Sequence, residues 1–125
     1  MNTSATTALL LFAHGSSDPG WAEPFTKLKA AVQARQPDGK VELAFLERMA
    51  PSFDEAVATL HRQGVQHITV APIFLAIGGH MRNDLPQLIE ETHMRTGITF
   101  RVLPALGEVE VLITAIADWV TASAN

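Results

Sequence analysis

The sequence contains no cysteine. This absence excludes a disulfide-stapled scaffold, a thiolate metal site and a cysteine nucleophile. It is consistent with a reducing compartment, where structural disulfides are rare. Candidate metal ligands are therefore histidines and carboxylates.

Positive charge is also sparse. The formal net charge is −4, and no run of Lys or Arg is present. Nucleic acid is therefore not expected as a partner, because phosphate binding depends on clustered cations. The longest apolar runs, residues 8–13 and 68–79, are too short to span a bilayer, so no membrane partner is expected. Residues 1–7 lack the basic start of a signal peptide, which predicts a cytoplasmic protein.

The chain has 125 residues, 47% of them hydrophobic. This length suits one domain, expected to span residues 1–125 with residues 1–6 as a disordered tail. A chain of this size buries roughly two thirds of its unfolded surface, which is enough for a real core.

Apolar runs alternate with helical patterns four times, which predicts an α/β fold. Strands are expected at residues 8–12, 40–46, 67–75 and 98–103. The first helix follows Asp18 and Pro19, a favourable N-terminal pair, and the second begins at Ser52 with Glu55 completing a capping box. The third helix is expected to begin near Asn83 or Asp84 and to end at Gly97. The apolar residues of the fourth helix are Val109, Leu112, Ile113, Ile116 and Val120.

Strict alternation implies a parallel sheet covered on both faces. Strands 8–12 and 67–75 are nearly all apolar, as central strands should be, whereas strands 40–46 and 98–103 alternate polar and apolar residues as edges do. The predicted order is therefore 2-1-3-4, a flavodoxin-like three-layer sandwich with a four-stranded parallel sheet. Pro72 lies inside the third strand, which predicts either a bulge or an end of regular pairing near Ala71.

Three metal-capable side chains follow three adjacent strands of this predicted sheet. His14 follows the first strand, Glu47 the second and His80 the third. Ligands of open parallel sheets bind beyond the carboxyl ends of the strands, so these side chains are expected to converge on one crevice. Imidazole suits Fe, Co, Ni and Zn, and a carboxylate adds charge. Taken alone, His14 and His80 are equally consistent with ordinary surface positions, and Glu47 alone is better explained as a solvated carboxylate.

Neighbouring residues fit a large ligand at the same edge. Gly15, Gly78 and Gly79 would let the backbone approach a flat or bulky molecule closely. Arg48 and Arg82 suit the binding of carboxylates, although both are equally explained as solubilising charges. The remaining histidines, away from this edge, are expected to be surface residues: His61, His67 and His93.

Several segments together resemble the CbiX family, the sirohydrochlorin cobaltochelatases and ferrochelatases of the class II chelatase group. They are residues 9–16 (LLLFAHGS), 41–47 (VELAFLE), 51–52 (PS), 71–75 (APIFL) and 78–80 (GGH). The resemblance implies a chelatase-like fold and insertion of Co²⁺ or Fe²⁺, with Ni²⁺ as a further candidate, into sirohydrochlorin. Neither ATP nor another nucleotide is implied, and the product would serve cobalamin or sirohaem biosynthesis.

The resemblance also implies roles for single residues. His14 and His80 match the metal-handling histidines of the family, and Glu47 matches an acidic residue. The substrate has many acidic groups, which would favour Arg48, Arg82 and backbone N–H groups at helix starts. The substrate-binding set is expected to comprise Gly15, Ser16, Arg48, Gly78, Gly79 and Arg82. Short forms of the family pair as homodimers. Many relatives have Arg after His-Gly-Ser, where this chain has Ser17.

Three other functions are compatible with parts of this pattern. A mannose-type IIA phosphocarrier would be phosphorylated on His14, but it gives no task to His80 or Glu47. A histidine phosphatase would need Arg where Ala13 stands. A non-catalytic metal-binding module would use the same two histidines.

Overall fold

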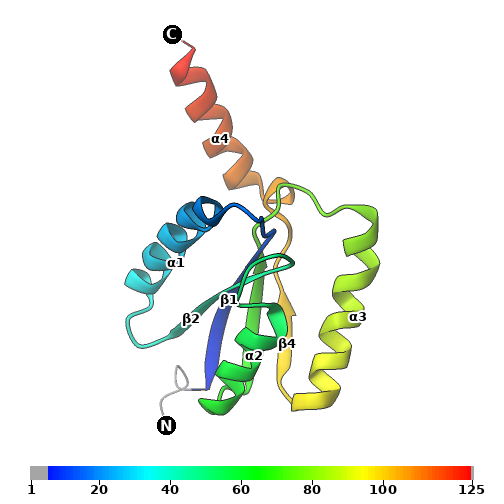
Figure 1. Ribbon diagram of the computed structural model, residues 1–125. Coiled ribbons are helices and arrows are strands. Elements are labelled where there is room, and N and C mark those ends of the chain that lie inside the picture. Colours follow the sequence, from blue (N-terminus) through cyan, green and yellow to red (C-terminus); the bar gives the residue numbers. More distant parts are fainter. Residues whose placement is uncertain (1–5, 125) are drawn as a thin grey trace.

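The computed structural model describes residues 6–124 and contains one four-stranded parallel sheet (Figure 1). Its order is β2-β1-β3-β4, which confirms the predicted topology. The strands are β1 (Thr7–Ala13), β2 (Lys40–Phe45), β3 (His67–Pro72) and β4 (Thr99–Val102). Residues 1–5 of the expected tail lie outside the described residues. The Thr6 carbonyl accepts hydrogen bonds from the backbone N–H groups of Gln66 and His67.

Pro72 ends the third strand without a bulge, three residues before the predicted end. Pairing with β1 continues to Phe12↔Pro72, and the Ile73 N–H donates to the Phe12 carbonyl at 2.7 Å. The nitrogen of Pro72 therefore faces β4, not β1. Pairing between β3 and β4 ends at Val70↔Val102. The N–H group that Pro72 lacks therefore shortens only the hydrogen-bonded pairing of β3 with the edge strand β4.

The helices are α1 (Glu23–Arg35), α2 (Phe53–Arg62), α3 (Gly79–Thr96) and α4 (Glu110–Ser123), with short 3₁₀ turns η2 (Pro19–Ala22) and η3 (Leu106–Glu108). Asp18 caps η2 by accepting the Gly20 N–H at 2.9 Å. Ser52 and Glu55 form the predicted capping box, with distances of 3.1 and 2.8 Å. Ser52 therefore marks the start of α2 as predicted, whereas Asp18 caps only η2, and α1 begins at Glu23 without a side-chain cap.

The predicted start of the third helix, near Asn83 or Asp84, was wrong. Helix α3 begins at Gly79, after Gly78 in an extended conformation. Pro86 consequently lies inside the helix, where its nitrogen cannot donate to the Arg82 carbonyl. The earlier start places His80 and Arg82 on the first turn of α3 and not in a loop.

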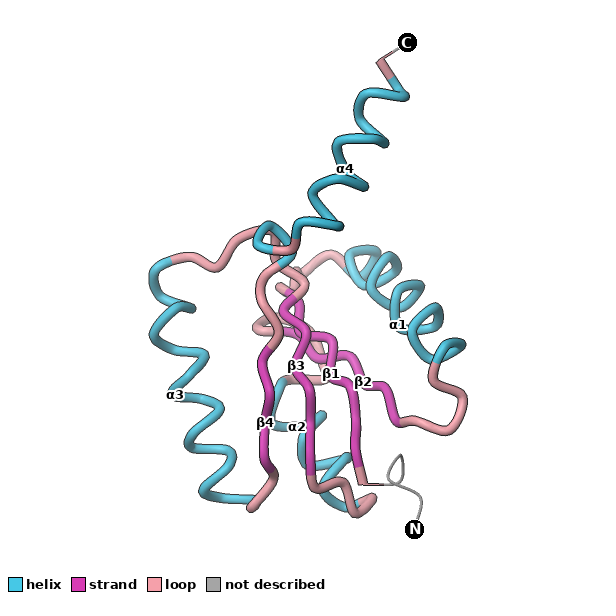
Figure 2. Tube along the Cα trace, turned by 180° about the vertical axis from the view of Figure 1, so that it is seen from behind, coloured by secondary structure: helices cyan, strands magenta, loops and turns pink. Residues whose placement is uncertain are grey.

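The two faces of the sheet are covered unequally. Helices α2 and α3 pack on one face over a large buried cluster that includes Leu10, Phe12 and Val70. On the other face, α1 covers a smaller cluster drawn from β1 and β2, with Leu11 and Phe45 among its members. Seen from behind, no helix lies in front of β3 and β4 (Figure 2).

Helix α4 extends away from the rest of the chain at the end where the strands terminate (Figures 1 and 2). It contains no buried residue among those described. Within residues 6–124, no helix is both long and apolar enough to cross a bilayer.

Candidate functional site

The carboxyl ends of β1, β2 and β3 place the predicted site residues at one edge of the sheet. His14 immediately follows β1, and Glu47 and Arg48 follow β2. The segment after β3 runs through Phe74 to the start of α3 at Gly79.

The side chain of His14 is exposed, but the residue is held at two points. Its ring packs against the ring of Phe74, with centroids 4.4 Å apart and planes inclined by 45°. Its carbonyl oxygen accepts a hydrogen bond from Nε1 of Trp21 at 2.7 Å. Phe74 is itself only 5% exposed and lies edge-on to Phe12 at 6.0 Å. The imidazole is therefore fixed to the core while it faces solvent.

Neither support of His14 was predicted as part of the site. Neither Trp21 nor Phe74 is among the site residues expected from the sequence. No spacing in the sequence indicates the indole contact, because it joins a loop carbonyl to η2 through tertiary packing.

Gly15 brings the loops after β1 and β2 into direct contact. A Cβ atom at Gly15 would collide with the carbonyl oxygen of Glu47. The Leu46 N–H donates to the Ala13 carbonyl at 2.8 Å, which joins the same two loops. Gly15 thus has a packing role within the chain: it allows the backbones beside His14 and Glu47 to touch.

Ser16, Glu47 and Arg48 shape this edge further. The Ser16 hydroxyl accepts the Asp18 N–H at 3.1 Å, which tightens the turn into η2. The Glu47 carbonyl accepts the Met49 N–H at 2.8 Å, and Arg48 between them has a left-handed φ of 66°. The side chains of Glu47 and Arg48 are exposed.

The start of α3 forms the other side of the edge. Gly78, Gly79 and His80 are exposed, and a Cβ at either glycine would meet no atom within 4 Å. The first N–H groups of a helix have no partner within the helix, so this start can donate to an anionic group. Arg82, on the first turn of α3, is exposed. Its Nη2 donates a long hydrogen bond of 3.4 Å to the Ile77 carbonyl oxygen.

The charged side chains at this edge form no ion pairs within residues 6–124. In the part of the chain that the structure describes, salt bridges join Lys29 to Glu42 and Arg95 to Asp54. Glu47, Arg48 and Arg82 take part in neither.

The structure does not assemble the three predicted ligands into one cluster. Among residues 6–124, no group of three or more His, Asp or Glu side chains is close enough together to hold a metal ion. The Gly15 contact joins the backbones near His14 and Glu47, whereas His80 belongs to α3. Metal ligation by His14, His80 and Glu47 remains a prediction.

An apolar groove of about 520 Å³ lies beside the first turns of α3. Its walls come from α3, β4, η3 and the segment before α3, and two charged residues contribute to the lining. The residues are Ile77, Met81, Arg82, Leu85, Pro86, Ile89, Val102 and Glu108. The groove therefore combines apolar walls with one cation and one carboxylate.

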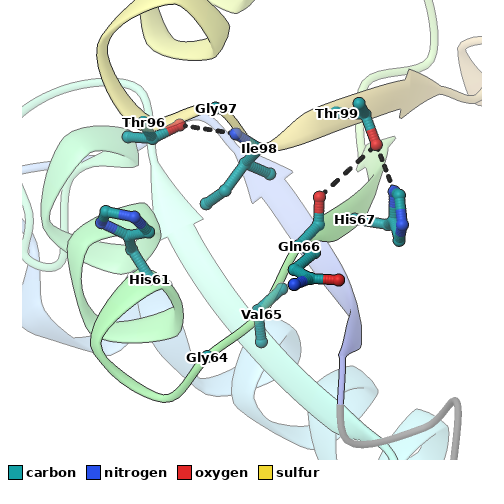
Figure 3. Close-up of a pocket in the computed structure, with 9 residues that line it drawn as sticks. All are labelled: His61, Gly64, Val65, Gln66, His67, Thr96, Gly97, Ile98 and Thr99. Atoms are coloured by element: carbon teal, nitrogen blue, oxygen red, sulfur yellow. Dashed lines mark hydrogen bonds between the residues drawn. The ribbon is translucent and has the colours of Figure 1, made fainter.

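A second hollow of about 500 Å³ lies at the opposite end of the strands (Figure 3). His61 and His67 line it and are exposed, as predicted. Nδ1 of His67 is hydrogen-bonded to Oγ1 of Thr99. His93 differs from the prediction, because it is partly buried and its Nδ1 lies 2.7 Å from the Ile98 carbonyl. These histidines are remote from the carboxyl edge.

The sheet order, with His14 just past β1 and His80 at the start of α3, fits the chelatase-like class of α/β proteins. The family model of CbiX matches residues 8–123. The chain therefore belongs to the CbiX family.

Curated relatives and solved structures agree with this assignment. The chain is 38% identical over 89 residues to the sirohydrochlorin cobaltochelatase of Methanocaldococcus jannaschii, a match that covers 69% of this chain and 62% of that protein. It is 32% identical over 82 residues to the enzyme of the same name from Methanococcoides burtonii, covering 66% and 63%. The match thus spans less than two thirds of the length of these relatives.

Among solved structures, a CbiX protein from Marinobacter aquaeolei VT8, whose name assigns it to cobalamin (vitamin B12) biosynthesis, is 37% identical with a TM-score of 0.84. The match covers 94% of this chain and 96% of that one. SirB from Bacillus subtilis, solved with Fe³⁺, is 23% identical with a TM-score of 0.76 and covers 90% of this chain and 45% of its own. That second likeness concerns the fold alone. The comparisons lend no support to the phosphocarrier or metal-module alternatives.

Proposed function

We propose that the protein is an ATP-independent chelatase that inserts Co²⁺ or Fe²⁺ into sirohydrochlorin, for cobalamin or sirohaem biosynthesis. The observation that most supports this is the placement of His14, an exposed imidazole packed on Phe74 at the carboxyl end of central strand β1. Family membership and the names of the relatives support the substrate class.

The reaction needs groups that bind a metal ion briefly and accept protons. Insertion of a divalent ion requires loss of its water shell and of two pyrrole N–H protons. Neutral imidazole can ligate the ion or accept a proton, so His14 and His80 suit both tasks. Glu47, exposed beside the Gly15 contact, would relay protons to solvent.

The apolar groove beside α3 offers a surface for the macrocycle. Its walls suit the flat apolar face of a tetrapyrrole, and Arg82 lies among the lining residues. The unpaired start of α3 at Gly78 and Gly79 would receive one acidic substituent, and Arg48 across the edge another. Gly15 and Ser16 would shape the floor of the site through their loop contacts.

The wider setting is part of the same proposal. The chain acts as one domain in the cytoplasm, and two copies pair as a homodimer. A single small α/β unit has one shallow sheet edge, whereas the substrate is a large macrocycle. No nucleotide takes part.

An absorbance assay with sirohydrochlorin and one metal ion at a time tests this function. We expect Co²⁺ or Fe²⁺, and Ni²⁺ in a third experiment, to be inserted faster with the protein than without it. The His14→Ala variant should return the rate to that of the uncatalysed reaction. If the protein accelerates the insertion of none of these ions, the chelatase function is refuted. A phosphohistidine formed from a phosphotransfer donor would favour the phosphocarrier function instead.

A further inference from the structure

Trp21 is an exposed aromatic residue that the fold holds in one place. It is 42% exposed, although tryptophan is on average highly buried. Its Nε1 donates to the His14 carbonyl at 2.7 Å, and its backbone N–H donates to the Asp18 carbonyl at 3.0 Å. Its ring packs against Phe25, with centroids 5.8 Å apart and planes inclined by 43°. The polar group of the indole is therefore occupied, and the surface that the ring exposes is apolar.

The loop between His14 and Trp21 is closed by hydrogen bonds and is not a free segment. The Ser16 hydroxyl accepts the Asp18 N–H at 3.1 Å, and Oδ1 of Asp18 accepts the Gly20 N–H at 2.9 Å. The bond from the indole to the His14 carbonyl then joins the two ends of the loop. Because the ring is held before any ligand arrives, a contact between this ring and a ligand would cost little conformational entropy.

Exposed apolar side chains also gather around His14. In the part of the chain that the structure describes, eleven large hydrophobic residues are exposed, and six of them belong to α4. Two of the others adjoin the contacts of His14: Trp21 is bonded to its carbonyl, and Leu75, 62% exposed, follows Phe74, whose ring packs on the imidazole. Apolar walls with a few polar groups are typical of sites for organic ligands. The surroundings of the imidazole therefore suit a large apolar molecule better than a hydrated ion alone.

Trp21 and the apolar groove beside α3 lie on opposite sides of the sheet. Trp21 is on the side of α1, because Phe25, which it touches, packs on the buried cluster of that face. The groove is on the other side, since its residues Ile77 and Met81 pack on the opposite cluster. Figures 1 and 2 both show α1 and α3 on opposite sides of the strand ends. A flat ligand lying across the strand ends above His14 would meet Trp21 at one side and α3 at the other.

We propose that Trp21 is a substrate-binding residue, against whose indole ring the tetrapyrrole macrocycle stacks beside His14. This inference rests on the proposed function, because it takes the macrocycle as the ligand. Stacked aromatic rings stabilise a complex beyond the apolar area that they bury. The indole then has two separable tasks: its N–H holds the His14 backbone, and its carbon surface contacts the macrocycle. Trp21→Phe removes only the donor, whereas Trp21→Leu removes the donor and the aromatic ring.

Calorimetric titration with metal-free sirohydrochlorin measures binding without the insertion reaction. Trp21→Leu should raise Kd about five- to tenfold over the wild type, and Trp21→Phe should keep it within about twofold. Met94→Ala, which removes a 75% exposed side chain near the other end of α3, is the control and should bind like the wild type. An unchanged Kd in Trp21→Leu would overturn the stacking. An equal rise in both Trp21 variants would assign the effect to the lost hydrogen bond and would also overturn it.

Nuclear magnetic resonance then shows whether the ring itself meets the macrocycle. The chain has two tryptophans, so the indole C–H signals of a ¹³C-labelled protein are assigned with Trp21→Phe and Trp119→Phe. Protons that lie over the face of an aromatic macrocycle move upfield in its ring current. At saturating sirohydrochlorin, the Trp21 signals should move upfield and the Trp119 signals should stay in place. Trp21 signals that do not move in the saturated complex would overturn the proposal.

The same two experiments separate this inference from the proposed function. A wild-type protein that does not bind sirohydrochlorin at all would refute both the stacking and the chelatase. Binding that moves the Trp21 signals upfield, in a protein that inserts no metal ion, would refute the chelatase while the stacking stands. Metal insertion by a protein whose Trp21→Leu variant binds as tightly as the wild type would refute the stacking alone.

Discussion

The indole Nε1 of Trp21 donates a hydrogen bond to the carbonyl oxygen of His14, 2.7 Å away. The contact joins η2 to the residue that follows the central strand β1. Together with the packing of the Phe74 ring against the imidazole, this hydrogen bond restrains the position of His14. If His14 acts in metal insertion as proposed, Trp21 would be a positioning residue that acts through this hydrogen bond.

Trp21→Phe should slow metal insertion while it preserves the fold. The substitution removes the N–H donor but keeps a ring near Phe25, which lies 5.8 Å from Trp21. Loss of one neutral hydrogen bond costs about 1 kcal/mol, which corresponds to about a fivefold lower rate. Steady-state kinetics should show the loss in kcat more than in KM. Trp119→Phe is the matched control, and equal effects in the two variants would contradict the positioning role.

Gly15→Ala should disrupt the contact between the loops after β1 and β2. The added methyl group would overlap the Glu47 carbonyl, so one backbone must move. Overpacking of this kind costs about 1–3 kcal/mol in the free energy of unfolding. Urea denaturation measures that loss, and the insertion rate should fall with it because His14 adjoins the displaced residue.

Gly20→Ala provides the comparison for Gly15. A Cβ at Gly20 would lie 3.4 Å from Oδ1 of Asp18, an ordinary contact. Its stability should therefore remain close to that of the wild type. A Gly15→Ala protein as stable and active as the Gly20→Ala protein would show that the loops do not need this close approach.

Arg48 and Arg82 are predicted to bind acidic substituents of the substrate. Replacing either with Ala should raise KM more than it lowers kcat, because the contact persists into the transition state. A hydrogen bond to a charged group contributes about 1.5–3 kcal/mol, which corresponds to roughly a 10- to 150-fold change. Arg62→Ala, on the last turn of α2, is the control and should leave KM unchanged. An unaltered KM in the Arg48 and Arg82 variants would contradict substrate binding and would favour the alternative that both residues only add solubilising charge.

The sheet was predictable because its order depends on local composition. Continuous apolar runs mark the central strands, and alternation marks the edges. The capping residue Ser52 marks the start of α2, and Asp18 marks the start of the 3₁₀ turn η2 that precedes α1. The start of α3 was mispredicted because Asn83 and Asp84 resemble a cap, whereas Gly78 forms the actual cap through its extended backbone alone.

The supports of the site were not predictable in the same way. The contacts of Trp21 and Phe74 with His14 depend on tertiary packing that no spacing encodes. The isolation of α4 also escapes sequence reasoning, since an apolar helical face looks the same in the sequence whether or not it packs on its own sheet. The strand order predicts that His14, His80 and Glu47 lie at the same edge of the sheet. It does not predict whether their side chains come close enough to share a metal ion.

The central claim is that His14 and His80 act as one unit in metal insertion. The measurement that tests it most directly is the insertion rate of Co²⁺ into sirohydrochlorin for His14→Ala, His80→Ala and the double variant, with His67→Ala as the remote control. We expect each single variant to lose most of the activity and the double variant to be little worse, since residues that work together are not additive. The His67→Ala protein should retain the wild-type rate. A near-normal rate in either His14→Ala or His80→Ala would contradict the account.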